Sequence, residues 1–273
     1  MQAATARATA TITKQRQQQL WAAGDFAKIA PGFALVGEML CESAELRAGQ
    51  TVLDVATGSG NTALAAARRW CTVTGIDFVP SLLQKARERA ACEGLAVTFQ
   101  EGDAESLPFA NASFDMVLST FGAMFAVEQE KAASELLRVC RPGGKVCMAN
   151  WTPEGFMAET FRKIAQYVPP PAGVRTPAAW GTEHGLRGLF GAGIVSLQVL
   201  RRRLDMRFHS SWHWLNHTRT HLGPVLLPFG MLDTPERERL STELLDLAQR
   251  YNRSGDATMV VPIDYLEVIA LRR

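Results

Sequence analysis

The segment from Thr51 to Ala67 (TVLDVATGSGNTALAAA) constrains the fold of this chain more than any other. A short apolar run ends at Asp54, a turn follows around Gly58 and Gly60, and an alanine-rich stretch with helical character comes next, which predicts a strand, a tight turn and a helix. Glycines let the backbone turn sharply and leave room for a ligand against bare peptide groups, so a nucleotide-like cofactor is the natural occupant. Taken alone, Gly58-x-Gly60-x-x-Ala63 would also pass as a dinucleotide-binding turn that holds a pyrophosphate.

Strand and helix signals then alternate. The further predicted strands are Cys71–Ile76, Val97–Glu101, Met116–Ser119 and Lys145–Asn150. The predicted helices begin at Pro80 and end before Gly94, and run from about Glu128 to Cys140, where Arg141-Pro142-Gly143-Gly144 is expected to stop the helix and turn into the next strand. This alternation predicts an α/β fold with a parallel sheet and helices on both faces.

The pattern changes after Trp151. The predicted elements there are a helix over Phe156–Tyr167, a rigid Pro169–Pro171 segment, a short helix or loop at Glu183-His184, a β-like run over Ile194–Phe208, a helical region over Ser210–Arg250 broken at Gly223-Pro224 and at Pro228, and a final strand over Thr258–Leu271. The two late strands are expected to pair at one edge of the sheet, with the helices between them capping the site. Pro262 is expected to mark the start or an irregularity of the last strand.

Carboxylates follow three of the predicted strands. Asp77 lies 77 − 60 = 17 residues beyond Gly60, near the roughly twenty at which an acid meets a ribose diol, although a helix-capping aspartate is the alternative. Asp103 follows the next strand, and Asp54 the first. Three acids at neighbouring strand ends suit a cationic, hydroxyl-rich, phosphate-free cofactor better than a dianionic one.

Four ordered blocks carry a family resemblance. VLDVATGSG, GIDFVPSLLQKA, GDAESLPFANASFDMVLS and LLRVCRPGGKV resemble the class I S-adenosylmethionine-dependent methyltransferases, in the small-molecule branch that includes ubiquinone and menaquinone C-methyltransferases. The resemblance is close over roughly residues 20–150 and holds in outline beyond. It implies a Rossmann-like, seven-stranded, mostly parallel sheet with an antiparallel last strand, a helical cap inserted near the C-terminus, and S-adenosylmethionine as cofactor.

The resemblance also implies roles for individual residues. Those lining the methionine part would be Asp54 and the backbone of Ala56, Thr57, Gly58 and Gly60. Those holding the adenosine would be Asp77 on the ribose hydroxyls, Phe78 against the adenine, and Asp103 with the Ala104 N–H at the adenine edge. Ser119 and Thr120 would face the reactive sulfur. The family commonly has glycine at position 56, so the alanine here suggests a slightly less open turn.

Methyl transfer by in-line displacement requires alignment and exclusion of water. Apolar side chains that could enclose the site, or equally lie in the core, are Met124, Phe125, Trp151, Trp180, Trp212 and Trp214. A general base is needed only for an acceptor that arrives protonated, and the candidates are His184, His209 and His213.

The last two candidates belong to a row with His217 and His221, spaced by four residues. Only neighbouring members of such a row share a helix face, which is most often a partly solvated one. No metal site is expected, because no H-E-x-x-H motif or cysteine partner lies nearby.

Composition excludes several other classes. A formal charge of +2 gives no broad basic field for nucleic acid or an anionic membrane, and Arg201–Arg203 is expected to be a strand with solvated ends. Five scattered cysteines without a C-x-x-C pair predict reduced, mostly buried thiols. No apolar run approaches the length of a membrane helix, so we expect no integral membrane segment and a cytoplasmic protein. The first ten residues would fit a frayed terminus or a transit peptide.

We therefore predict one domain over residues 1–273. Its parts are N-terminal lid helices (12–48), a cofactor-binding core (49–151), substrate-side helices and cap (152–257) and the last strand (258–273). The predicted function is transfer of a methyl group from S-adenosylmethionine to a small organic acceptor. The alternatives are an NAD-dependent oxidoreductase and a catalytically inactive S-adenosylmethionine-binding partner protein.

Overall fold

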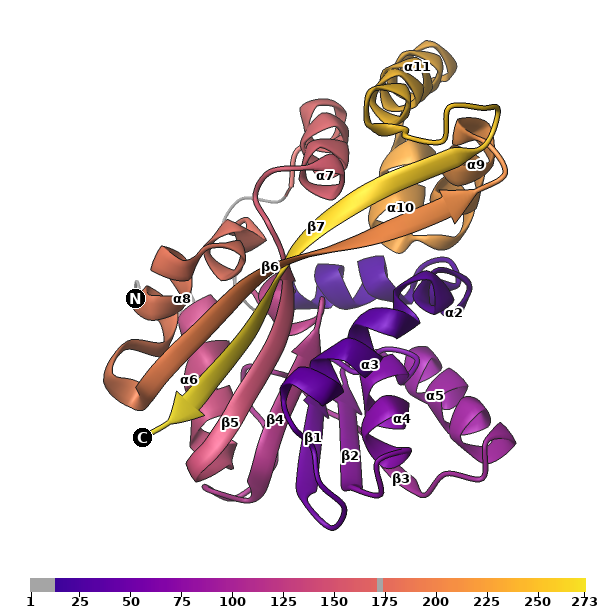
Figure 1. Ribbon diagram of the computed structural model, residues 1–273. Helices are drawn as coiled ribbons and strands as arrows, with labels where there is room; N and C mark the ends of the chain where they lie inside the picture. Colours follow the sequence, from indigo (N-terminus) through magenta and orange to yellow (C-terminus); the bar gives the residue numbers. More distant parts are fainter. Residues whose placement is uncertain (1–12, 171–173) are drawn as a thin grey trace.

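A seven-stranded sheet organises the molecule (Figure 1). The structure, a computed structural model, describes residues 13–170 and 174–273. The strand order is β3-β2-β1-β4-β5-β7-β6, and the strands are β1 (Thr51–Val55), β2 (Thr72–Asp77), β3 (Val97–Glu101), β4 (Phe114–Thr120), β5 (Cys140–Trp151), β6 (Ile194–Phe208) and β7 (Met259–Arg272). The first five are parallel, whereas β7 runs antiparallel to both β5 and β6. The predicted Rossmann-like, mostly parallel sheet with its late edge pair is therefore confirmed.

Helices cover both faces because the parallel strands are apolar on both sides. Within β1, Val52 packs into one core cluster and Leu53 into the other. The helices beside the first cluster are α3 (Ala34–Ser43), α4 (Asn61–Ala67) and α5 (Pro80–Cys92), and those beside the second are α6 (Gln129–Val139) and α8 (Glu183–Phe190). The short connecting helices are α2 (Phe26–Ile29), η1 (Ala30–Phe33), η2 (Ala123–Phe125), η3 (Pro177–Gly181) and η4 (Gly191–Gly193), where η marks a 3₁₀ helix.

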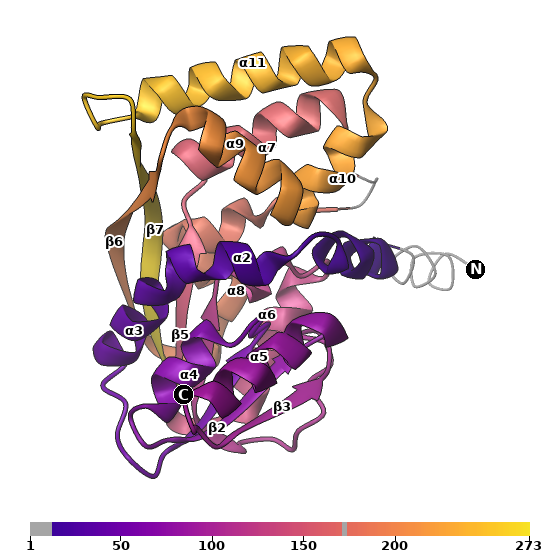
Figure 2. The ribbon, with the colours of Figure 1, turned by 90° about the vertical axis from the view of Figure 1, so that its right-hand side faces the viewer.

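A helical cap stands on an extension of the sheet (Figures 1 and 2). Pairing between β5 and β7 ends where Trp151 faces Tyr265, but β6 and β7 continue as a two-stranded ribbon to the Phe208–Met259 pair. The ribbon carries the cap helices α7 (Phe156–Tyr167), α9 (Ser211–His221), α10 (Gly223–Met231) and α11 (Thr234–Tyr251). The ribbon thereby holds the cap above the carboxyl ends of the parallel strands.

The N-terminal segment runs between the sheet and the cap (Figure 2). Residues 13–22 are helical and lead into α2 and η1. The segment is tied to the cap where the Asp25 N–H donates to the His221 carbonyl at 3.0 Å, and Gly24 forms a β-bridge with Leu222. It therefore closes the space between the strand ends and α9.

Three local predictions were wrong. Residues 141–144 do not end the α6 region in a turn but lie within β5 as a bulge, because Phe114 pairs with Cys140 and Met116 already pairs with Lys145. Pro228 lies inside α10, and the helix break comes at Leu232-Asp233, where Asp233 and Glu236 form a capping box at the start of α11.

Pro262 neither starts β7 nor disturbs its register, since it pairs with Asp205 within a continuous ladder. Pro262 lies beyond the end of the β5 pairing, so β7 has a hydrogen-bonded neighbour on only one edge there. The missing N–H of proline is therefore tolerated.

Two further expectations concern the whole chain. All five cysteines are free thiols, of which four are buried and Cys92 is exposed, as the sequence predicts. Among the residues that the structure describes, no helix has both the length and the apolar character needed to cross a bilayer. The first ten residues, Ile12 and Pro171 lie outside the described residues.

Candidate functional site

A cavity of about 550 Å³ lies where the strand ends, the N-terminal segment and the cap meet. Its floor consists of residues at and just after the carboxyl ends of β1, β2, β3 and β4, and its roof of the end of β6 and of α9. Carboxyl ends of parallel strands are where open α/β sheets bind ligands. This volume is within the usual range for a pocket that binds one small molecule, with room left for part of a second ligand.

Asp54 lies at the centre of the floor and is almost fully buried. Its Oδ2 accepts hydrogen bonds from the Thr57 hydroxyl at 2.6 Å and from the Ala63 N–H at 2.9 Å. Its Oδ1 is buried without a partner among the described groups. Burial raises the pKa of Asp54 to about 7, although these hydrogen bonds act against the rise. A nearby cation would stabilise the ionised form of this buried carboxyl group.

The turn after β1 brings backbone to the cavity surface. Ala56, Thr57 and Gly58 line it, and both Ala56 and Gly58 have φ of 55°. An alanine in this left-handed region is strained by about 1–2 kcal/mol. Phe121, at the end of the neighbouring β4, has φ of 54° and lines the cavity too. Such strain at two adjacent strand ends is typical of ligand-binding sites.

Asp77 is the last residue of β2, Phe78 follows it, and both line the cavity. The Asp77 carboxylate accepts the Gly58 N–H at 2.8 Å and the Val79 N–H at 2.9 Å, so it braces the glycine turn and the residue before α5, but it is not the capping residue of that helix. Burial raises the pKa of Asp77 to about 6. Each carboxylate oxygen can accept a second hydrogen bond, so the side chain can also serve a diol.

Asp103 and Ala104 follow β3, and the N-terminal helix reaches them. The Lys14 ammonium lies 2.5 Å from Asp103 Oδ2 and 2.6 Å from Glu105 Oε2. Burial alone would lower the pKa of Lys14, but its hydrogen bonds to both carboxylates raise it. Glu105 is 2% exposed, and its Oε1 accepts the Val127 and Glu128 N–H groups. The ion pairs hold residues 13–22 against the strand ends.

Two predicted cofactor residues do not line the cavity. Gly60 has φ of 90°, which favours glycine, and a Cβ there would lie 3.2 Å from the Ala86 Cβ, so its role in the structure is tight packing of α4 near α5. Ser119 is fully buried and bonds to the Val55 carbonyl and the Ala123 N–H. Thr120 does line the cavity, with its hydroxyl 2.8 Å from that of Thr62.

Aromatic rings form one side of the cavity. The lining rings in mutual contact are Trp21, Phe26, Phe33, Phe121, Phe125 and Trp151, with neighbouring centroids 5.1–6.3 Å apart. Of the six side chains predicted to enclose the site, only Phe125 and Trp151 are among them. The others lie in the core, as Met124, Trp180 and Trp214 do, or on the surface, where Trp212 lies under Arg219.

The predicted bases fall in different places. His184 on α8 and His209 are exposed and do not line the cavity, whereas His213 does. Burial and the neighbouring His209 and His217 lower the pKa of His213. His217, which was not among the base candidates, also lines the cavity and contacts the Lys28 carbonyl at 3.2 Å. Among the described residues no group of three or more ligating side chains could hold a metal ion.

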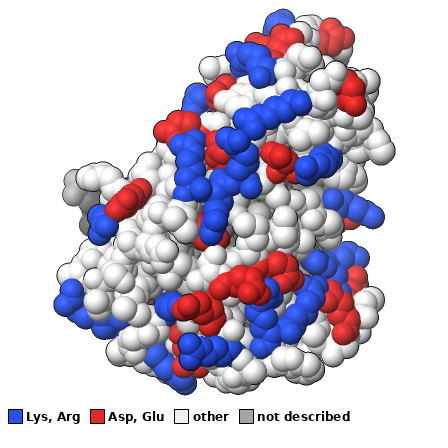
Figure 3. All heavy atoms as spheres, in the orientation of Figure 1, with Lys and Arg blue, Asp and Glu red and all other residues white. Residues whose placement is uncertain are grey.

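Charges of both signs intermingle on the face drawn in Figure 3. The arginine triplet of β6 is paired with carboxylates of β7, since Arg201 and Arg203 contact Asp264 and Arg202 contacts the buried Glu267. These pairs connect neighbouring strands, so the triplet contributes no separate anion site.

Other lining residues were missed by the sequence reading. They come from the N-terminal segment and from the end of β6 and include Lys14, Gln17, Trp21, Met206 and Phe208. The sequence signal of the apolar ones is periodicity, which predicts a buried face but not the partner that covers it, and the polar Lys14 and Gln17 lack even that signal.

The floor of the cavity fits S-adenosylmethionine. The N-terminal turn of α4, where a dinucleotide would place its pyrophosphate, is already occupied by the Asp54 carboxylate through the Ala63 N–H. The phosphates of a dinucleotide would also face the carboxylates of Asp54 and Asp77, both nearly fully buried, and like charges repel. A cation with a diol and no phosphate instead finds carboxylates at the ends of β1, β2 and β3.

Comparisons with known proteins agree with this chemistry. A family model described as a methyltransferase domain matches residues 52–144. The chain is 39% identical to the uncharacterized protein Rv1403c of Mycobacterium tuberculosis over 256 residues, which are 90% of this chain and 93% of that protein. It is 37% identical to demethylmenaquinone methyltransferase of Thermus thermophilus over 161 residues, 53% of this chain and 73% of that protein.

A solved structure agrees at the level of the fold. A putative methyltransferase from Bacillus halodurans matches with a TM-score of 0.59 and 22% identity, covering 85% of this chain and 96% of that one. Fold, strand-end carboxylates and relatives lead to one family: the chain belongs to the class I S-adenosylmethionine-dependent methyltransferases.

Proposed function

We propose that this enzyme methylates a small organic acceptor with an apolar, ring-bearing body. The observation that carries the proposal is that a single cavity joins the carboxylate floor to the aromatic side. The floor suits the cationic cofactor. The opposite side offers Phe33, Phe125 and Trp151, which bury flat apolar surface and exclude water.

Specific floor residues are proposed to hold the cofactor. Asp54 and the backbone of residues 56–58 would hold the methionine part, Asp77 the ribose hydroxyls, and Asp103 with the Ala104 N–H the adenine edge. What supports these roles is the position of each group at a strand end lining the cavity. Gly60 and Ser119 would act indirectly, by fixing the turn after β1 and the end of β4.

The bound cofactor supplies a methyl group on a sulfonium, and the chain supplies alignment. The aromatic rings would hold the acceptor, and Thr120 lies at the end of β4 between floor and aromatic side. His213 is the proposed base for an acceptor that arrives protonated, because it lines the cavity and its pKa is lowered by burial and by the neighbouring histidines. We also propose that residues 12–48 act as a lid, 49–151 as the cofactor core, and 152–257 as the acceptor side.

Isothermal titration calorimetry and acceptor turnover test the proposal together. We expect binding of S-adenosylmethionine and S-adenosylhomocysteine, loss of binding in Asp77→Asn, and no binding of NADH. Label from methyl-tritiated S-adenosylmethionine should then pass to ring compounds, with a demethylated quinol, a phenol and an aromatic amine as the panel and a short aliphatic amine as control. Tight binding with no turnover on any of these would favour the inactive partner protein, and NADH binding would favour the oxidoreductase.

A further inference from the structure

A half-buried arginine supports the glycine turn from outside the cavity. Arg89 Nη1, from α5, donates to the Ser59 carbonyl at 2.7 Å and to Asn61 Oδ1 at 2.8 Å, with the Ser59 hydroxyl at 3.3 Å. Arg89 does not itself line the cavity. Burial lowers its pKa and the Glu93 carboxylate acts in the opposite direction, although Arg89 forms no salt bridge among those of the described residues. A partly buried guanidinium without a carboxylate is costly, so its hydrogen bonds to the turn are its main compensation.

Asn61 transmits this support across the cavity rim. Its Nδ2 donates to the Ala30 carbonyl of η1 at 2.7 Å, while its Oδ1 accepts from Arg89. The amide orientation is fixed because a guanidinium can only donate and a carbonyl can only accept. The η1 helix also carries Phe33, whose ring contacts those of Phe121 and Trp151 on the aromatic side.

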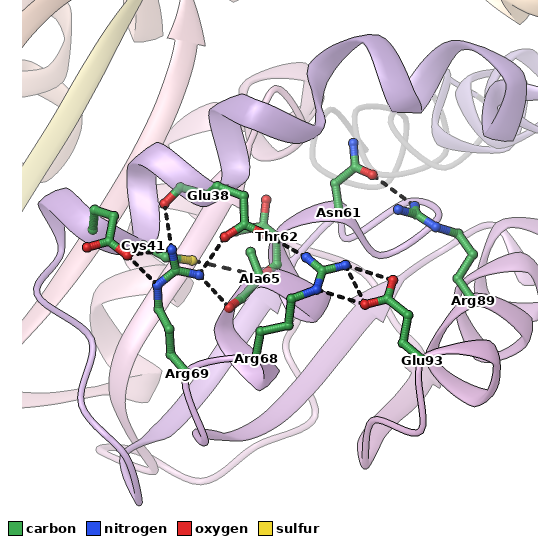
Figure 4. A network of polar contacts seen from close by, with 10 residues as sticks. Glu38, Cys41, Asn61, Thr62, Ala65, Arg68, Arg69, Arg89 and Glu93 are labelled. Atoms are coloured by element: carbon green, nitrogen blue, oxygen red, sulfur yellow. Dashed lines mark hydrogen bonds and ion pairs between the residues drawn. The ribbon is translucent and has the colours of Figure 1, made fainter.

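The neighbouring arginines behave differently (Figure 4). Arg68 is paired with Glu38 and Glu93, and Arg69 with Glu38 and Glu42, whereas the dashed line from Arg89 leads to Asn61. Arg68 connects α4 to α3 and α5 without a hydrogen bond to residues 57–61. It is therefore a matched control: an arginine of the same network that does not support the turn.

We propose that Arg89 is a positioning residue, which sets the turn at residues 57–61 for the methionine part of the cofactor and, through Asn61, sets η1 on the aromatic side. The inference rests on the proposed function, because it assigns the methionine part to this turn. Arg89 acts from outside, so its loss should affect the two halves of the cofactor unequally. Asp103 in the adenosine half is held by the Glu105 N–H and by Lys14, both outside the turn, and Asp77 keeps the Val79 N–H although its other bond comes from Gly58 of the turn.

Two ligands separate the halves of the cofactor. S-adenosylhomocysteine contains the amino acid part, and 5′-methylthioadenosine lacks it. By calorimetry, Arg89→Met should weaken S-adenosylhomocysteine binding about tenfold or more, since hydrogen bonds to a charged group are lost, and 5′-methylthioadenosine by less than about threefold. Arg68→Met should leave both affinities within about twofold. Arg89→Lys keeps the charge but reaches fewer of the three acceptors, so it should fall between wild type and Arg89→Met.

Hydrogen exchange on the ligand-free protein gives a second readout that does not depend on the cofactor. Arg89→Met should speed exchange at residues 57–61 and at 30–33 by about tenfold, with β4 and β5 unchanged. Asn61→Ala should affect 30–33 more than 57–59, which Arg89 still holds through Ser59.

The proposal would be overturned if Arg89→Met weakened the binding of both ligands equally, or if it left both affinities unchanged and lowered only the Tm. It would also be overturned if Arg89→Lys showed no intermediate loss of affinity and hydrogen exchange in Arg89→Met stayed at the wild-type rate. If the wild type binds neither ligand, the proposed function fails, and the exchange comparison still decides whether Arg89 couples the turn to η1.

Discussion

Replacing Asp54 by asparagine should make the folded protein more stable relative to wild type as the pH rises. Burial raises the pKa of Asp54 from 3.8 to about 7 in the folded protein. At about 1.4 kcal/mol per pH unit, this corresponds to about 4 kcal/mol of destabilisation when the group must ionise. The unfolded chain ionises near pH 4 while the folded one keeps its proton. The penalty is therefore absent below pH 4, grows between pH 4 and 7, and is complete above pH 7.

Asparagine fits the local hydrogen bonds. Its oxygen can accept from Thr57 and Ala63 as Oδ2 does, and its NH₂ takes the place of Oδ1, which has no partner. That buried NH₂ costs about 1–3 kcal/mol at every pH, so it cancels when two pH values are compared. The stability of Asp54→Asn relative to wild type should thus increase by about 4 kcal/mol between pH 4 and pH 8.

Thermal unfolding at pH 4, 6 and 8 measures this change. With about 2–4 °C of Tm per kcal/mol, the gap in Tm between variant and wild type should shift by roughly 8–16 °C. S-adenosylhomocysteine should raise the Tm of wild type at pH 8 and leave that of Asp54→Asn unchanged.

Asp77→Asn is a comparison with a smaller expected pH effect, because burial raises the pKa of Asp77 only to about 6; both its oxygens accept backbone N–H groups, and an amide can replace only one of them. It should lose about 1–3 kcal/mol at pH 4. A Tm gap for Asp54→Asn that is the same at all three pH values would refute the raised pKa and the reasoning built on it.

Three further predictions concern the strand ends and the lid. Ala56→Gly should stabilise the protein by up to about 1 kcal/mol in urea unfolding, because glycine relieves the left-handed φ of 55°, whereas Ala66→Gly inside α4 should destabilise it. Gly122→Ala should cost about 2 kcal/mol or more and weaken S-adenosylhomocysteine binding, since its Cβ would lie 2.6 Å from that of Ala56; a wild-type Tm would contradict the clash. Lys14→Met should speed hydrogen exchange over residues 13–22 several-fold at low salt, whereas Lys14→Arg should not. Equal exchange rates in the two variants would show that the Lys14 ion pairs do not hold this segment.

The sequence by itself determined the sheet and the carboxylates near its strand ends. Strand-like runs that lead into Asp54, Asp77 and Asp103 locate both the strands and the acids near their ends, because a residue close to the end of a parallel strand lies at the carboxyl edge of the sheet. The same local logic gave β6 and α7 at their observed bounds.

Proline and glycine effects were less reliable where packing outweighs local preference. Pro228 is buried in α10 and does not end it, and Pro262 is tolerated because β5 has already ended beside it. Residues 141–144 contain two glycines and a proline yet continue β5 as a bulge. In each case the neighbouring strand or helix decides whether a lost hydrogen bond matters, and no local pattern contains that neighbour.

Only the tertiary structure decided what faces the cofactor floor. Lys14 meets Asp103 across 89 positions, and Phe33 meets Trp151 across more than a hundred, so neither contact follows from spacing along the chain. His213 lines the cavity while His209, one turn away, does not, because the ribbon of β6 and β7 sets how α9 lies over the strand ends. Local sequence fixes which residues end a strand, whereas long-range packing fixes which side chains from elsewhere close over that end.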